Sequence, residues 1–106
     1  MTIEDDQLAA QREYLEALRK GAGPDTDILL DLNYNMKPEG YIRILRELED
    51  FDLFWVEIDS PSAEALADVR RESPHTISSG EAVVPNESFV PFLRERAMAV
   101  VIIDAL

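Results

Sequence analysis

The chain has 106 residues and no cysteine, which predicts one small globular unit without disulfides or thiolate metal sites. Acidic residues outnumber basic ones 22 to 10, and the net charge of -12 argues against nucleic acid or an anionic membrane as a partner. The acidic N-terminus lacks the apolar core of a signal peptide, and no apolar run is long enough to cross a bilayer, so we expect a cytoplasmic protein.

The first part of the chain predicts a helix and then a short strand. Residues 5–20 place Leu8, Leu15 and Leu18 at helical spacing, and glycine follows directly. After a turn, residues 28–30 form a short apolar run that is typical of a buried strand.

A second helix and strand follow. Pro38 opens the helix, because proline is favoured at the first helical position. Its apolar side chains recur at helical spacing: Tyr41, Ile42, Leu45 and Leu48. Residues 51–56, FDLFWV, are almost entirely apolar and predict the second strand.

A third unit begins where Ser60 or Ser62 can cap a helix that turns Leu66 and Val69 inward. Residues 75–79 then predict the third strand.

The fourth helix opens at Asn86 or Ser88, and Pro91 falls in or near its first turn. Its apolar side chains, expected in the core, are Phe89, Phe92 and Leu93. Residues 97–103, AMAVVII, predict the fourth strand. Apolar strands that alternate with helices indicate an α/β fold with a parallel sheet.

Each predicted strand is followed by a carboxylate: Asp31, Glu57, Glu81 and Asp104, at intervals of 26, 24 and 23 residues. In parallel α/β folds the carboxyl ends of the strands carry the chemistry. Neighbouring strands lie about 4.8 Å apart, so acids at matched heights would repel each other without a cation. Magnesium accepts such oxygen ligands. Acidic residues also commonly end strands, and the pattern alone leaves both interpretations open.

A calcium loop is a poorer explanation of residues 31–35, DLNYN. The sixth position of such a loop requires glycine and is Met36 here. The twelfth requires a bidentate acid and is Ile42 here. The preceding residues also resemble a strand rather than a helix.

The segments LLDLNYN, FWVEID, SSGEAV and VVIID together resemble consecutive strand ends of the enolase superfamily, in its mandelate racemase-like branch. This resemblance, over residues 14–106, implies a partial (β/α)8 TIM barrel of about four consecutive βα units with parallel strands. It also implies one Mg²⁺ ion held by Asp31, Glu57 and Glu81.

The resemblance extends to three further residues. Asp104 matches the position that orients a catalytic histidine from the next strand. Asn33 would lie behind the ligands or against the substrate, and Trp55 would pack beside the ligands or contact the substrate. The implied reaction removes a proton α to a carboxylate, as in an acid-sugar dehydratase (a lyase) or a racemase (an isomerase). The implied substrate is a small carboxylate such as a sugar acid.

The sequence departs from the family pattern after Glu57, where Ile58 and Asp59 replace the usual glutamate and proline. The lysine and histidine that act as bases in the family have no match here. Lys37 lies in a loop, and His75, the only histidine, precedes the third strand, so we interpret His75 as structural.

We therefore expect residues 1–106 to be a single segment of an enolase-superfamily barrel, without the N-terminal capping domain and the remaining strands. Such a segment carries the Mg²⁺ ligands of the enzyme that the resemblance implies and is expected to be inactive alone. The alternative is a non-catalytic half-barrel that serves as a metal-binding or assembly module. Unpaired apolar edges at residues 28–30 and 97–103 predict self-association.

Overall fold

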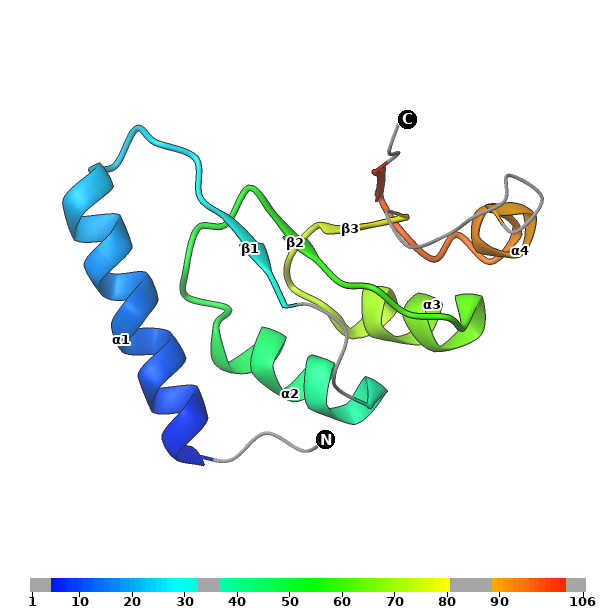
Figure 1. Ribbon diagram of the computed structural model, residues 1–106, viewed down its shortest axis with the longest axis horizontal. Helices are drawn as coiled ribbons and strands as arrows, with labels where there is room; N and C mark the ends of the chain where they lie inside the picture. Colours follow the sequence, from blue (N-terminus) through cyan, green and yellow to red (C-terminus); the bar gives the residue numbers. More distant parts are fainter. Residues whose placement is uncertain (1–4, 33–36, 81–88, 103–106) are drawn as a thin grey trace.

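A computed structural model describes residues 5–32, 37–80 and 89–102 of the chain. Helices and strands alternate as predicted (Figure 1). The elements are α1 (Asp5–Ala22), β1 (Leu29–Asp31), α2 (Pro38–Glu47), β2 (Trp55–Glu57), α3 (Ala63–Glu72), β3 (Ile77–Ser79), α4 (Phe89–Arg94) and β4 (Val100–Val101). No helix within the described ranges combines the length and apolarity needed to span a membrane.

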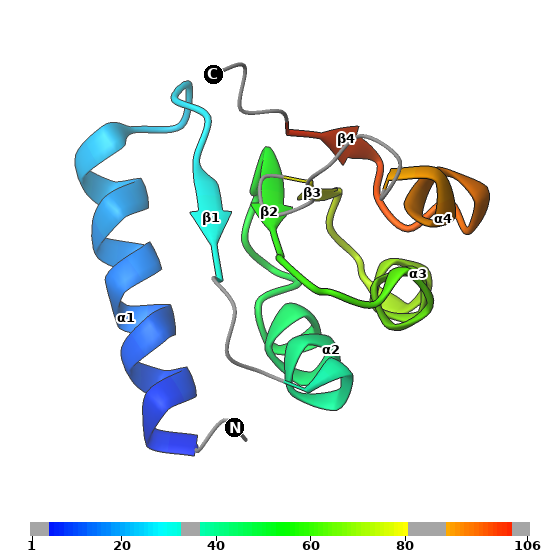
Figure 2. The ribbon, with the colours of Figure 1, turned by 45° about the vertical axis from the view of Figure 1, so that its right-hand side comes forward.

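The strands form one parallel sheet in the order β1-β2-β3-β4, so each strand pairs with the next one along the chain. The four helices lie outside this sheet in an arc, and the opposite face of the sheet is turned away from them (Figure 2). Sequential parallel pairing with helices on one face is the arrangement of a (β/α)8 barrel. The predicted α/β fold with four parallel strands is confirmed.

Helix α1 buries Leu8 and Leu15, which lie seven residues apart and therefore on one face. Leu18, which the helical spacing places on the same face, is 41% exposed. A step of three residues turns a helix by about 300°, so Leu18 falls at the margin of the apolar face. The helix ends before Gly23, whose φ of 84° is accessible to glycine without strain.

Helix α2 begins at Pro38, as predicted, with Lys37 as its N-cap. Its buried side chains include Tyr41, Leu45 and the following Leu48, whereas Ile44 was not predicted and is 1% exposed. Ile42 is only partly buried against the same core. The apolar face of this helix is therefore rotated slightly from the face that the sequence predicts.

Helix α3 is capped by Ser62 rather than Ser60. The Ser62 hydroxyl accepts a hydrogen bond from the Ala65 amide at 3.1 Å, which satisfies one of the free N–H groups of the first turn. Ser60 instead accepts a hydrogen bond from the Ser62 amide at 3.2 Å and so stabilises the preceding turn. Leu66 and Val69 are both buried, as predicted.

Helix α4 carries Pro91 in its first turn, as predicted, while Asn86 and Ser88 lie outside the described residues. Phe92 is buried and Phe89 is partly buried. The expectation that Leu93 is core is wrong, because it is 59% exposed. Leu93 directly follows Phe92, and successive helical residues point about 100° apart.

The strands are shorter than the apolar runs that predicted them. Residues 51–56 were predicted to be strand, but pairing begins only at Trp55. Phe51 instead closes the turn after α2, where its amide donates to the Leu48 carbonyl oxygen at 3.0 Å. The apolar residues between α2 and β2 pack the turn against the core instead of extending the strand, and Leu53 is buried there.

Side chains hold the segments that lead into the strands. Arg19 donates hydrogen bonds to the carbonyl oxygens of Thr26 at 2.6 Å and Asp52 at 2.7 Å. These acceptors precede β1 and β2. These contacts fix the amino-terminal ends of the two strands against α1.

The same arrangement recurs before β4. Arg70 donates to the carbonyl oxygens of Arg96 at 2.8 Å and Met98 at 3.1 Å. Arg96 has a φ of 52°, an uncommon conformation for a residue with a side chain, and this hydrogen bond holds its peptide in place.

Both outer strands expose apolar side chains. Leu29 on β1 is 49% exposed and Val101 on β4 is 39% exposed. Within the described part of the chain, neither outer edge has a further strand beside it. Of the apolar edges predicted at residues 28–30 and 97–103, Leu29 and Val101 are exposed, whereas Ala97 and Met98 are buried and residue 103 lies outside the described residues.

Candidate metal centre

Asp31 and Glu57 occupy the last positions of β1 and β2 and are register partners. Side chains of partnered residues in parallel strands point to the same face of the sheet, and the two strands are about 4.8 Å apart. Leu30 and Val56, one residue earlier, are also partners, and Val56 is buried in the core beneath the helices. The two carboxylates therefore share the face that is turned away from the helices.

The other predicted site residues lie outside the described residues. These are Asn33, Glu81 and Asp104. Within residues 5–32, 37–80 and 89–102, no group of three or more His, Asp or Glu side chains is placed to hold a metal ion. The structure therefore brings together two of the three predicted ligands, and the third remains a prediction.

Gly80 directly precedes the predicted ligand Glu81. Its φ is 122°, and a Cβ atom there would lie 2.7 Å from the carbonyl oxygen of Ile102. A side chain at this position would therefore strain the backbone and collide with the extension of β4. Glycine in the G-E motif thus allows β3 and β4 to approach closely at their carboxyl ends.

Trp55 begins β2 and lies two residues before Glu57, so its side chain points to the same face as that carboxylate. Its register partner is Leu29. Its ring contacts Phe54, with centroids 5.1 Å apart. Trp55 is half-buried, and its role beside the ligands or against the substrate stays a prediction.

The donor set fits a hard divalent cation. Magnesium is commonly bound by one or two carboxylates, with water or substrate oxygens completing its octahedron. Asp31 is exposed and Glu57 is half-buried, so both can reach an ion that keeps part of its water shell. Softer ions favour cysteine or histidine ligands, and the chain has no cysteine and a single histidine.

That histidine does not belong to the carboxylate face. His75 precedes β3 and is half-buried. Its Nε2–H group donates a hydrogen bond to the Leu48 carbonyl oxygen at 3.0 Å, which joins the start of β3 to the end of α2. The structural interpretation of His75 is supported by this contact.

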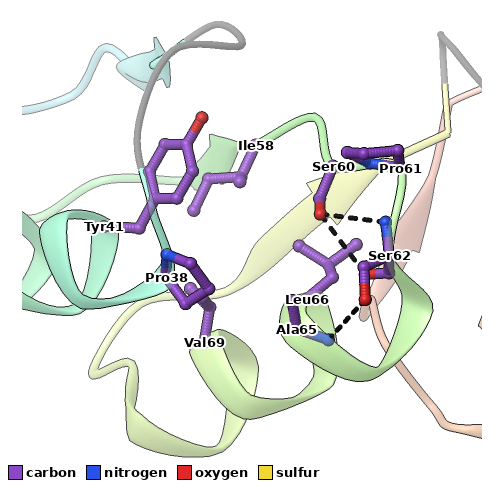
Figure 3. A pocket seen from close by; sticks show the side chains of 9 residues that line it. All are labelled: Pro38, Tyr41, Ile58, Ser60, Pro61, Ser62, Ala65, Leu66 and Val69. Carbon is purple, nitrogen blue, oxygen red and sulfur yellow. Dashed lines mark hydrogen bonds between the residues drawn. The ribbon is translucent and has the colours of Figure 1, made fainter. Parts of the chain in front are cut away.

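A separate cavity of about 230 Å³ lies on the helix side of the sheet (Figure 3). It is lined by Pro38 and Tyr41 from the start of α2 and by Leu66 and Val69 from α3, and Ile58 contributes from the end of β2. Ile58 follows Glu57 along the chain. The cavity is almost entirely apolar and is distinct from the carboxylate face.

The parallel strands pair in sequential order and are covered by helices on one face, which is the arrangement of an α/β barrel. Two acidic side chains at the carboxyl ends of adjacent strands form a candidate cation site. The whole chain, residues 1–106, matches the family model described as Enolase C-terminal domain-like. The chain therefore belongs to this family, in agreement with the resemblance seen in its sequence.

One curated relative is a 3,6-anhydro-alpha-L-galactonate cycloisomerase from Streptomyces coelicolor. It is 32% identical over 83 residues, which cover 76% of this chain and 23% of that protein. A D-galactonate dehydratase family member from Oceanicola granulosus is 35% identical over 69 residues, covering 63% of this chain and 17% of that protein.

Among solved structures, a proposed L-alanine-DL-glutamate epimerase from Burkholderia xenovorans, bound to magnesium and fumarate, is 57% identical. Its TM-score is 0.95, over 97% of this chain and 26% of that one. An enolase from Bradyrhizobium, complexed with magnesium and mandelic acid, is 28% identical with a TM-score of 0.86, over 92% of this chain and 27% of that one. The matched part of the chain thus covers between 17% and 27% of the length of these relatives.

One residue beside the two carboxylates was not predicted. Ser78 on β3 is the register partner of Glu57. The sequence TISSGE suggested only a strand that leads to a G-E motif. The sequence shows that Ser78 lies three residues before Glu81. Its position beside Glu57 follows only from the register of β2 and β3.

Proposed function

We propose that this chain is the magnesium-binding segment of an enzyme that removes a proton α to the carboxylate of a small acid. Its ligands are Asp31, Glu57 and Glu81. The observation that supports this proposal most directly is the register pairing of Asp31 with Glu57 at the carboxyl edge of the sheet. Membership of the Enolase C-terminal domain-like family and the magnesium present in similar structures agree with it.

The chemistry explains why carboxylates would be placed there. A proton α to a carboxylate is very weakly acidic, because its removal places a second negative charge on the same group. A divalent cation, when bound, would supply Lewis-acid stabilisation of that charge. Asp31 and Glu57 would hold the cation in position, and Glu81 would complete the protein ligands.

The remaining site residues have supporting roles in this proposal. Trp55 would limit water access beneath the ligands, and Asn33 would contact the ligands or the substrate. Asp104 would orient the base. A sugar acid is the proposed substrate class, with dehydration or racemisation as the outcome, because similar proteins are described as dehydratases and racemases.

A base is not evident among the described residues. The only histidine binds the Leu48 carbonyl oxygen, and Lys37 is the N-cap of α2. The second candidate function is a non-catalytic half-barrel that binds metal or assembles through its exposed edges. Leu29 and Val101 provide such edges.

Magnesium binding tests the metal site. Isothermal titration of the 106-residue chain is expected to show Mg²⁺ binding that Glu57→Gln and Glu81→Gln each weaken at least tenfold. Glu13→Gln, an exposed residue on α1, is the matched control and should leave binding unchanged. Equal binding in all four proteins would contradict the proposed ligands.

Turnover separates the two candidate functions. The isolated chain is expected to show no measurable dehydration or racemisation of sugar acids, because it supplies no evident base. A longer protein that contains this segment and adjoining barrel strands should be active if the enzyme proposal is correct. Magnesium binding without activity in that longer protein would select the non-catalytic module.

A further inference from the structure

Asp31, Glu57 and Ser78 lie side by side on three adjacent strands. Glu57 is the register partner of Asp31 on one side and of Ser78 on the other. Backbone hydrogen bonds fix this alignment, since the Ile58 amide donates to the Ser78 carbonyl oxygen at 3.0 Å. Partners in adjacent parallel strands point to the same face, so the Ser78 side chain lies beside that of Glu57.

The Ser78 hydroxyl is buried without a hydrogen-bond partner. Ser78 is 0% exposed, and its Oγ atom has no partner in the part of the chain that the structure describes. Burying an unpaired hydroxyl is unfavourable, so a serine at this position needs an acceptor that its surroundings can provide. Ionised carboxylates only accept hydrogen bonds, and the register partner of Ser78 on β2 is Glu57.

Ser79 provides an internal comparison. It is 1% exposed, and its Oγ atom also lacks a partner in the described structure. Successive strand residues point to opposite faces, so Ser79 lies on the helix side, away from Glu57. The two serines therefore match in residue type, burial and strand, and differ in the face that they occupy.

We propose that Ser78 is a positioning residue for the metal centre. With the cation bound, its hydroxyl would donate a hydrogen bond to the Glu57 carboxylate, or to a water molecule on the cation, and so hold Glu57 in its ligating orientation; without the cation the Ser78 Oγ atom has no partner among the described residues. This inference rests on the proposed magnesium site. Side chains that orient ligands in this way commonly contribute ten- to a hundredfold to metal affinity.

Titration of Mg²⁺ into the 106-residue chain tests the proposal by calorimetry, together with thermal unfolding in EDTA and in saturating Mg²⁺. Ser78→Ala is expected to weaken Mg²⁺ binding about tenfold and to reduce the magnesium-dependent rise in Tm. Ser79→Ala should bind Mg²⁺ within about twofold of wild type. In EDTA neither substitution should lower Tm, because each removes a buried hydroxyl that has no partner.

The outcomes distinguish this inference from the proposed function. If wild type binds Mg²⁺ and Ser78→Ala binds it equally well, Ser78 does not position the site and the metal site itself stands. Equal weakening by Ser79→Ala would also overturn the inference, because a general effect of β3 packing would then explain both. A wild-type chain that binds no Mg²⁺ would overturn the metal site and this inference with it.

Discussion

Asp31 and Glu57 are register partners on adjacent parallel strands, so two like charges share one edge of the sheet. Like charges placed directly opposite each other destabilise a sheet. The same geometry that is proposed to bind a cation should therefore cost stability when no cation is bound.

This relationship predicts opposite effects of one substitution in two conditions. In EDTA, Glu57→Gln should raise the free energy of unfolding by about 0.5 kcal/mol, because it removes the repulsion while keeping the shape of the side chain. In saturating Mg²⁺ the same variant should be less stable than wild type. Urea denaturation in both buffers measures this, with Glu13→Gln as the control. A loss of equal size in both buffers would contradict the prediction.

Gly80 predicts a large loss of stability on a minimal change. Gly80→Ala should destabilise the chain by about 2 kcal/mol or more, because its φ of 122° strains a residue with a side chain and the new Cβ meets the Ile102 carbonyl oxygen. Gly21→Ala is the control, since nothing lies within 4 Å of a Cβ there. Replacing glycine near the end of α1 should be neutral or stabilise by up to about 1 kcal/mol. Similar Tm values for the two variants would show that the close approach is unimportant.

The ion pair between Arg12 and Asp50 predicts a dependence of stability on pH. Nη1 and Nη2 of Arg12 donate to Oδ1 and Oδ2 of Asp50 at 2.9 and 2.7 Å. These hydrogen bonds lower the pKa of Asp50 below its ordinary value of 3.8, and they raise the pKa of Arg12. Because the folded pKa of Asp50 is the lower one, the pair contributes stability above pH 3.8 that is lost as the pH falls through the folded value.

Asp50→Asn should therefore remove part of the acid sensitivity of the chain. Unfolding midpoints measured from pH 6 to pH 2 should fall less steeply for this variant than for wild type. Asp25→Asn, at an exposed position in the turn after α1, serves as the control. Parallel curves for wild type and Asp50→Asn would show that the ion pair does not contribute to folding.

His75 predicts a loss of stability without a loss of metal binding. His75→Ala removes the hydrogen bond to the Leu48 carbonyl oxygen and should cost about 1 kcal/mol in urea denaturation. Its Mg²⁺ affinity should equal that of wild type, because His75 precedes β3 and the carboxylates follow the strands. Weaker Mg²⁺ binding at unchanged stability would instead place His75 in the site.

The sequence predicted the element order because each element carries a strong local signal. Apolar runs alternate with helical spacing, Pro38 opens α2, and Ser62 caps α3. The burial of single side chains was harder to predict, because it depends on which way each residue points from its helix. Leu18 and Leu93 are apolar but lie at the margin of their helical faces, and spacing alone does not fix the rotation of a helix against its sheet.

The candidate site was predictable only in part for a related reason. Intervals of 26 and 24 residues place Asp31, Glu57 and Glu81 at similar points of a repeating unit, and this predicted that they lie on one edge. Ser78 was missed because its relation to Glu57 depends on strand register, which joins residues 21 positions apart through backbone hydrogen bonds. No local pattern encodes such a pairing.

The hydrogen bonds made by Arg19, Arg70 and His75 all end on carbonyl oxygens of segments that precede or turn toward the amino-terminal ends of the strands. The acids of the candidate site lie at the other ends. The contacts made by these three side chains and the candidate metal site therefore occupy opposite rims of the sheet. A library that randomises the loops after β1 and β2 should leave these three anchors intact, and the scaffold can then accept new specificities without being redesigned for stability.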